Sequence, residues 1–140
     1  TVDAVDNDKY ALATLQKNCQ GCTSTHLGDV SAYLVRYKKA EDRKLQGRID
    51  CIIVTAPCQG FSGANRRGGK HDKEHNDLSL TVIEAARLHL PTCLVFENVL
   101  GMWRRKHVHY LKNIVKELIK LDYQVRVTEL RACHYGSAQI

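Results

Sequence analysis

Hydrophobic and polar residues repeat along the chain with two different periods. Short runs rich in β-branched residues predict strands, and apolar residues spaced three or four positions apart predict helices. The predicted strands span residues 2–5, 25–30, 49–56, 92–96 and 123–130. The predicted helices span residues 10–18, 33–45, 78–90 and 106–121. Strands that alternate with helices in this order predict an α/β domain with a doubly wound parallel sheet and right-handed crossovers.

Individual residues sharpen the limits of these elements. Asp8 is suited to cap the first helix, and Asp77 is suited to cap the helix at 78–90, which Pro91 should end. The run at 49–56 is nearly all apolar, so it is predicted to be a central, buried strand. The run at 123–130 alternates apolar and polar residues, as an outer strand does.

Length and composition indicate one globular unit. The chain has 140 residues, with 44% apolar and 26% charged residues and a net charge of +6, so wholesale disorder is not expected. Its apolar runs are far too short for a membrane span, and no signal-like segment opens it. It begins within a predicted strand and stops within a predicted loop. We therefore expect a fragment of a larger domain.

The cysteine pattern favours a reducing, intracellular setting. Cys51 and Cys93 lie in apolar strand-like runs, where a cysteine acts as a small hydrophobic residue. Cys19, Cys22 and His26 invite comparison with a zinc site. A structural zinc site needs four ligands, however, and no second Cys/His pair stands at finger-like spacing. We predict no metal site.

Polar and reactive residues follow four of the predicted strands. Doubly wound sheets bind ligands at the carboxyl ends of their strands, so these positions are candidate site residues. The first strand is followed by Asp6, the second by Gly28–Val30, the third by Pro57–Ser62 and the fourth by Glu97–Val99. Asp6 could accept hydrogen bonds from ribose hydroxyls or could serve only the helix that follows. Both interpretations stay open on this residue alone.

The segment that begins at Pro57 carries the clearest candidate chemistry. Cys58 follows the predicted buried strand directly, and nearby positive charge would favour the reactive thiolate form of such a thiol. Residues 57–77 lack apolar periodicity, and loops of this length are often functional. The loop is rich in glycine and in basic residues: Arg66, Arg67, Lys70, His71, Lys73 and His75. It suits a polyanionic substrate, although a solvated charged loop would have the same composition.

Two motifs in this order resemble the DNA (cytosine-5) methyltransferases. They are PCQGFS, which contains Cys58, and ENV, which contains Glu97 and follows the next strand. Weaker similarities extend along the chain: AVDNDKYALATLQKN to the family's cofactor strand and helix, GDV to its adenine-contacting turn, NDL to a helix entry, and HYGSAQ to the start of its YGxxQ segment. The resemblance implies a Rossmann-like fold that uses S-adenosylmethionine.

The resemblance implies covalent catalysis on a cytosine in DNA. Cys58 would add to carbon 6 of the base, which activates carbon 5 to accept a methyl group. Glu97 would hold the Watson–Crick edge and protonate ring nitrogen 3, and Asn98 would hold that segment in place. The cytosine must leave the base stack for this chemistry.

The resemblance also implies binding residues. The cofactor contacts would be Asp6, Asn7, Asp29, Val30, Pro57 and Leu78. The DNA contacts would be Gln59, Ser62, Arg66, Arg67, Lys70 and Lys73. Residues 1–140 are then a fragment of one catalytic domain. The family's glycine-rich cofactor loop and target-recognition region are not found in these residues, so the fragment alone is expected to be inactive.

Three other functions remain as alternatives. The chain could be a catalytically silent homologue that binds DNA or a partner enzyme, although a silent copy has no chemical need for both Cys58 and Glu97. It could be a tRNA-directed member of the same family, although the residues after Cys58 look more like those of the DNA enzymes. A nucleotide-dependent oxidoreductase would share the fold alone. PCQGFSGANR is more similar to eukaryotic members, which favours the nucleus.

Overall fold

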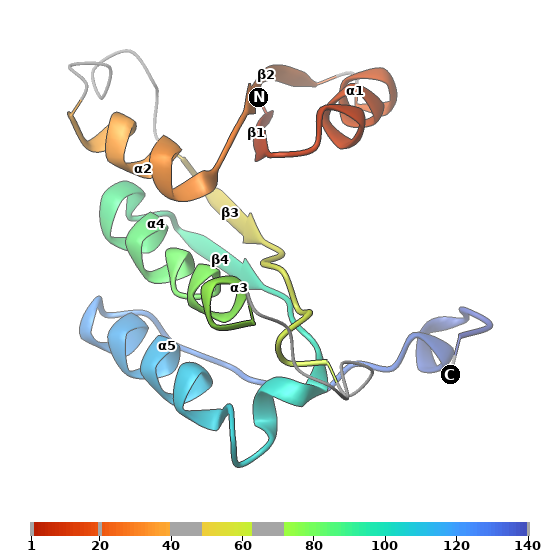
Figure 1. Ribbon diagram of the computed structural model, residues 1–140, viewed down its shortest axis with the longest axis vertical. Helices are drawn as coiled ribbons and strands as arrows, with labels where there is room; N and C mark the ends of the chain where they lie inside the picture. Colours follow the sequence, from red (N-terminus) through yellow and green to blue (C-terminus); the bar gives the residue numbers. More distant parts are fainter. Residues whose placement is uncertain (1, 20, 40–48, 63–71, 140) are drawn as a thin grey trace. The chain divides into compact units, whose positions relative to one another are not determined.

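The computed structural model describes residues 2–19, 21–39, 49–62 and 72–139 (Figure 1). The chain forms two compact units. The first contains Thr1–Val54 and Glu84–Phe96, and the second contains Thr55–Ile83 and Glu97–Ile140. The elements in chain order are β1 (Val2–Asp6), α1 (Lys9–Asn18), β2 (Cys22–Leu27), α2 (Val30–Lys39), β3 (Cys51–Val54), α3 (Asp72–Leu78), α4 (Thr81–His89), β4 (Cys93–Phe96), η2 (Leu100–Trp103), α5 (Val108–Lys120) and η3 (Ala132–Tyr135). This confirms the predicted mixture of helices and strands.

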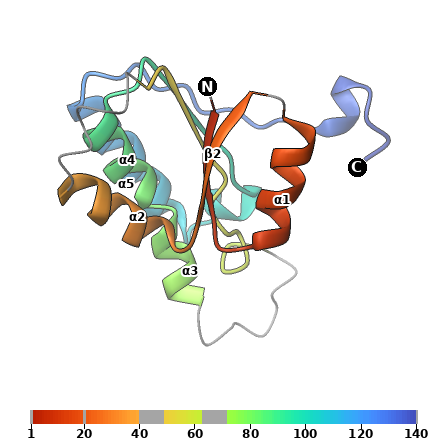
Figure 2. The ribbon, with the colours of Figure 1, turned by 90° about the horizontal axis from the view of Figure 1, so that it is seen from above.

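The first three elements form a strand–helix–strand segment in the first unit. β1 and β2 pair in parallel, with Asp6 opposite Leu27, and α1 connects them (Figure 2). Asp8 caps α1 as predicted, because its carboxylate accepts hydrogen bonds from the N–H groups of Tyr10 and Ala11 at 2.7 and 3.4 Å. Such a cap contributes about 1 kcal/mol to helix stability. β2 begins and ends three residues earlier than the predicted strand at 25–30.

β3 and β4 form a second parallel pair, from Cys51 opposite Cys93 to Val54 opposite Phe96 (Figure 1). Within the described ranges the strands make two separate two-stranded sheets. β3 therefore has β4 on one side only, and Ile53 is 69% exposed. The prediction of a buried central strand at 49–56 is wrong for the described residues. Apolar composition makes burial favourable, but a neighbouring strand or helix has to provide it.

The predicted helix at 78–90 corresponds to α4, which begins only at Thr81. The prediction of a loop over 57–77 is wrong at its end, because residues 72–78 form a separate helix, α3. Ser79 and Leu80 separate the two helices. The Ser79 hydroxyl donates to the Asn76 carbonyl at 2.6 Å, and the Thr81 hydroxyl donates to the Leu78 carbonyl at 2.7 Å. These side chains compete with the backbone for the carbonyls that a continuous helix would use. The predicted cap, Asp77, consequently lies inside α3. The helix end is close to the prediction, because α4 stops at His89, just before Pro91.

The C-terminal part differs from the prediction at 123–130. Helix α5 covers most of the predicted helix at 106–121. The predicted strand that follows it is wrong, because the structure places residues 123–130 in no regular element. An alternating pattern favours a strand only when a neighbouring strand edge is available for pairing. η3 follows, and Gly136 ends it in the left-handed conformation with φ +86°.

Each unit has its own buried side chains. In the first unit, α1 and α2 supply Leu12, Leu34 and Tyr37, and α4 supplies Ala85 and Ala86. In the second unit, Val82 and Ile83 at the start of α4 are buried, as are Phe61, Met102, Ile114 and Leu118. Phe61 belongs to the segment that contains Cys58, so the candidate site is attached directly to the core of the second unit.

Candidate active site

Cys58 lies in a short closed turn that follows β3. The Cys58 carbonyl oxygen accepts hydrogen bonds from the backbone N–H groups of Phe61 at 3.0 Å and of Ser62 at 2.9 Å. The Cys58 thiol is free of any disulfide and partly exposed. We call residues 58–62 the Cys58 turn. The backbone of this turn is fixed while its thiol keeps access to a ligand.

Glu97 and Asn98 follow β4 at the same edge of the sheet. β3 and β4 are parallel, so the chain leaves both strands in the same direction. The Asn98 side-chain amide donates to the Ala56 carbonyl at 3.3 Å, and its Oδ1 accepts the N–H of Val99 at 2.9 Å. This amide therefore joins the segment that leads into Cys58 to the segment that carries Glu97. The Glu97 side chain is exposed.

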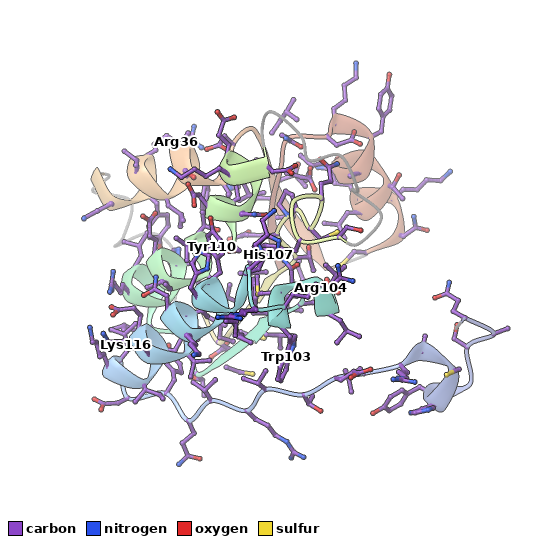
Figure 3. The ribbon with its side chains drawn as sticks, turned by 60° about the horizontal axis from the view of Figure 1, so that its bottom comes forward. Arg36, Trp103, Arg104, His107, Tyr110 and Lys116 are labelled. Carbon is purple, nitrogen blue, oxygen red and sulfur yellow. The ribbon has the colours of Figure 1, made fainter. Side chains whose placement is uncertain are left out.

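Phe61 anchors the Cys58 turn in the core of the second unit. It is 1% exposed, and two rings from the start of α5 contact it nearly edge to face. The His107 ring lies 5.2 Å from the Phe61 ring at an angle of 85°, and the Tyr110 ring lies 5.3 Å away at 77°. Each such aromatic pair adds about 0.5–1.5 kcal/mol beyond the burial of its area. Figure 3 labels His107 and Tyr110 at this end of α5.

Two glycines allow the backbone to approach this turn closely. A Cβ added at Gly101, in η2, would lie 1.7 Å from the Phe61 carbonyl oxygen. A Cβ added at Gly60 would lie 2.2 Å from Oδ1 of Asn76, a buried residue of α3. Both distances are impossible for real atoms, so η2 and α3 fit against the Cys58 turn only because these positions are glycine.

Tyr110 connects α5 to α3 as well as to Phe61. Its hydroxyl donates to Oδ1 of Asp77 at 3.0 Å. Burial raises the pKa of Tyr110, and the hydrogen bond to Asp77 and the charge of Asp77 raise it further. The phenol therefore stays protonated at neutral pH and remains a donor.

The surroundings of His107 lower its pKa and so favour its neutral form. Burial lowers the pKa of His107 most, and the positive charges of Lys106, His109 and Arg104 lower it further, against a smaller opposite effect of Asp72. A neutral imidazole packs against the Phe61 ring without the cost of a buried charge. The environment that buries Phe61 thus also fixes the charge state of its neighbour.

The predicted cofactor residues Asp6, Asn7, Asp29 and Val30 lie in the first unit. Asp6 is the last residue of β1 and Asp29 lies two positions after β2, so both stand at the same edge of this parallel pair. Oδ1 of Asp6 accepts the N–H of Asp8 at 2.8 Å, and Oδ1 of Asp29 accepts the N–H of Ala32 at 3.0 Å. Both side chains are exposed. Two exposed carboxylates at one sheet edge are suitable acceptors for the hydroxyls of a ribose.

The other predicted residues are more scattered. Pro57 and Gln59 are exposed, whereas Ser62 and Leu78, the last residue of α3, are partly buried. The exposed Lys73 lies in α3, with its Nζ 3.9 Å from Oδ2 of Asp77. The predicted DNA contacts Arg66, Arg67 and Lys70 fall outside the described residues.

Sequence reasoning missed the residues that support the Cys58 turn, among them Gly101, His107 and Tyr110. His107 and Tyr110 are three positions apart, which places them on one side of a helix. That spacing carries no information about Phe61, which is far away in the sequence. The one local signal is the glycine at position 101, which is separated from the ENV segment by Leu100 and is compatible with a close backbone approach.

An open apolar groove of about 550 Å³ lies along α5. It is lined by Trp103, Leu111, Lys112, Val115, Lys116, Ile119, Lys120 and Val127. None of these is a predicted site residue. The candidate chemistry therefore lies at the strand ends and not in this groove.

The described residues contain neither a candidate metal site nor a helix that could cross a membrane. Among them, no three His, Cys, Asp or Glu side chains are grouped so that they could hold a metal ion. No helix in the same part of the chain has the length and hydropathy needed to cross a membrane.

A family model described as "C-5 cytosine-specific DNA methylase" matches residues 1–140. Among curated proteins, the chain is 32% identical to "DNA (cytosine-5)-methyltransferase 4" of Arabidopsis thaliana over 148 residues, which cover 96% of this chain and 9% of the relative. It is 32% identical to "Type II methyltransferase M.XorII" of Xanthomonas oryzae pv. oryzae over 145 residues, covering 99% and 32%.

A shorter match is 36% identical over 94 residues to "Type II methyltransferase M.DdeI" of Desulfomicrobium norvegicum, covering 65% of this chain and 22% of the relative. Across these three proteins the chain spans between 9% and 32% of the relative's length. The similarity includes both plant and bacterial proteins.

Proposed function

Because the chain belongs to the family of C-5 cytosine-specific DNA methylases, we propose that it is part of an enzyme that methylates carbon 5 of cytosine in DNA. The methyl donor proposed is S-adenosylmethionine, and the proposed complete fold is a Rossmann-like, doubly wound domain. Two parallel strand pairs, each with candidate residues at its carboxyl end, support that fold.

The observation that carries the proposal is the connection between the Cys58 and Glu97 segments. Both leave one edge of the β3–β4 pair, and the hydrogen bond from Asn98 to Ala56 joins them. Covalent activation of a pyrimidine ring needs a nucleophile and an acid that act on the same base. A shared sheet edge is a simple way to hold such a pair.

Cys58 is the proposed nucleophile. Its thiolate forms a sulfur–carbon bond to carbon 6 of a cytosine that has left the base stack. The 5,6 double-bond electrons shift to the bond between carbons 4 and 5, and the electrons of the double bond between carbon 4 and nitrogen 3 shift to nitrogen 3. Glu97 donates a proton to ring nitrogen 3, so carbon 5 becomes the nucleophilic end of a neutral enamine. Carbon 5 then gains the methyl group and loses its proton to a water molecule. As the 5,6 double bond re-forms, the proton on nitrogen 3 returns to Glu97, the bond to Cys58 breaks and the thiolate is regenerated.

The chain's acidic residues in the first unit are the proposed contacts for the donor's adenosyl part. Asp6 and Asp29 would accept hydrogen bonds from it, with Asn7, Val30, Pro57 and Leu78 as further contacts. S-adenosylmethionine, when bound, supplies an electrophilic methyl group on a sulfonium ion. The two exposed carboxylates at one sheet edge support this assignment.

DNA is the proposed substrate, and the cationic residues near Cys58 are the proposed backbone contacts. Arg66, Arg67, Lys70 and Lys73 would neutralise phosphates, whereas Gln59 and Ser62 would lie against the strand next to the flipped base. A net charge of +6 supports a polyanionic substrate. In a eukaryotic cell this activity would be nuclear.

Methyl transfer by the natural full-length protein tests the proposal. Labelled methyl groups from S-adenosylmethionine should appear in cytosine-containing DNA and not in tRNA, and Cys58→Ser should abolish the signal because a hydroxyl is a far weaker nucleophile at neutral pH. Cys133→Ser, which removes another exposed free thiol of the second unit, is the control. Transfer to tRNA alone, or full activity of Cys58→Ser, would contradict the proposal.

A further inference from the structure

Tyr110 makes two contacts that together involve the Cys58 turn and α3. Its ring packs against Phe61, the buried anchor of the turn, with centroids 5.3 Å apart. Its hydroxyl donates to Asp77 of α3 at 3.0 Å. One side chain on the first turn of α5 is thus in contact with both segments.

The turn and α3 also fit against each other directly. Gly60 lies so close to α3 that a Cβ there would be 2.2 Å from Oδ1 of Asn76 and 2.8 Å from the Asp72 carbonyl oxygen. A shift of α3 by a few tenths of an ångström would therefore change the position of the turn. Close-packed protein interiors transmit such shifts from one segment to the next.

The hydrogen bond from Tyr110 restrains the position of α3 relative to α5. Ring contacts tolerate sliding, whereas a bond from a phenol to a carboxylate fixes a distance and an angle. The phenol keeps its proton at neutral pH, because burial and Asp77 both raise its pKa. The bond is therefore present under the conditions in which the Cys58 thiolate would react.

We propose that Tyr110 is a positioning residue for Cys58: by holding Phe61 with its ring and Asp77 with its hydroxyl, it sets the Cys58 turn in the geometry needed for attack on the base. This inference rests on the proposed cytosine methylation. Tyr110 touches neither substrate nor cofactor in this account, and its effect on the reaction passes through Phe61 and α3.

The test measures how fast Cys58 is trapped by DNA that contains 5-fluorocytosine, using the natural full-length protein with saturating DNA and S-adenosylmethionine. Fluorine cannot leave as a proton does, so the covalent adduct accumulates. Tyr110→Phe keeps the ring and removes the bond to Asp77, and should slow trapping about tenfold, since small displacements of reacting groups are costly. Tyr10→Phe is the matched control, because Tyr10 is 72% exposed on α1, and should trap at the parental rate.

A second set of variants separates positioning from general loss of stability. Asp77→Asn keeps an acceptor oxygen and should trap within about twofold of the parent, whereas Asp77→Ala should match Tyr110→Phe. Tyr110→Phe combined with Asp77→Ala should be no slower than either variant alone, because both remove the same bond. The dissociation constant for DNA should stay unchanged in Tyr110→Phe. The Asp77 variants also remove the partner of Lys73, a proposed phosphate contact, so their trapping rates are compared only at saturating DNA.

Equal trapping rates for Tyr110→Phe and Tyr10→Phe would overturn the inference. Additive effects of Tyr110→Phe and Asp77→Ala would also overturn it, because the two side chains would then act independently. If the parent protein itself forms no adduct, the proposed function fails, and that result is distinct from any difference among the variants.

Discussion

Asp6 and Asp29 are each held by a backbone N–H group two or three residues away, whereas the Cys58 turn is held by residues from distant parts of the sequence. The hydrogen bond between Asn98 and Ala56 spans 42 positions, and the one between Tyr110 and Asp77 spans 33. The proposed cofactor contacts are thus set by local strand–helix junctions. The proposed nucleophile is set by the packing of α3, η2 and α5.

This difference determines how each region should respond to substitution. A local hydrogen bond can form whenever the neighbouring turn is formed, so its loss should affect little beyond the side chain itself. The Cys58 turn depends on several elements at once, so substitutions that do not touch a substrate should still change it. Substitutions in the two regions should therefore differ in how far their effects reach.

The largest effect on the rate of methyl transfer is expected at Glu97, the proposed acid, which precedes the Asn98 that is hydrogen-bonded to Ala56. Glu97→Gln keeps the size of the side chain and cannot donate the same proton, so the rate of methyl transfer should fall roughly 100-fold. Steady-state kinetics at saturating DNA and S-adenosylmethionine measure this. Glu84→Gln, an exposed position on α4, is the control, and near-parental turnover of Glu97→Gln would reject the assigned role.

Glycine substitutions test the packing of the Cys58 turn. A methyl group at Gly101 would lie 1.7 Å from the Phe61 carbonyl oxygen, so Gly101→Ala should lower the free energy of unfolding by about 1–3 kcal/mol. Gly21→Ala, with no atom within 4 Å of the added carbon, should change it by less than about 0.5 kcal/mol. Denaturant unfolding measures both. Equal effects would mean that η2 does not pack against Phe61 in solution.

A smaller and more selective effect is expected at Asp6. Asp6→Ala removes one charged acceptor, so S-adenosylmethionine should bind about tenfold more weakly, which corresponds to the loss of a single hydrogen bond. Methyl transfer at saturating donor should stay near the parental rate, because the Cys58 turn is not involved. A large fall in that rate with unchanged donor affinity would show that the two regions are not separable in this way.

The smallest effect concerns the pH dependence of stability. Burial and neighbouring positive charges lower the pKa of His107 in the folded protein. The unfolded chain then binds a proton first as the pH falls through about 6.5, so the folded state should lose stability below that pH. His107→Gln should reduce this loss between pH 7 and pH 5. His134→Gln is the control, because His134 is exposed on η3 and is not among the groups that shift the pKa of His107. Denaturant unfolding at several pH values in this range measures the effect. If the free energy of unfolding fell equally with pH in His107→Gln and in the parent, the expected contribution of His107 would be contradicted.

The same contrast explains what the sequence could predict. The cap at Asp8, the parallel strand pairs and the positions of Cys58 and Glu97 after strands all follow from local patterns. The break between α3 and α4 could not be predicted from periodicity, because it depends on the hydroxyls of Ser79 and Thr81 bonding back to the helix. The strand expected at 123–130 does not form, because an alternating pattern only favours a strand and cannot supply the neighbouring strand that it must pair with.

The contribution of Tyr110 was beyond sequence reasoning for a related reason. A tyrosine on an amphipathic helix is ordinarily a packing residue, and nothing local connects it to Phe61 or Asp77. Only the fold brings these three side chains together. Motifs therefore indicated which residues could carry the chemistry, and the structure was needed to show which residues support them.

Identifying which residue becomes attached to the base decides whether Cys58 is the nucleophile. The natural full-length protein would be incubated with DNA containing 5-fluorocytosine and S-adenosylmethionine, digested, and analysed by mass spectrometry for the modified peptide. We expect a single nucleotide adduct on Cys58, which disappears in Cys58→Ser. An adduct on another cysteine, such as Cys19 or Cys133, or methylated DNA formed without any adduct on Cys58, would contradict it.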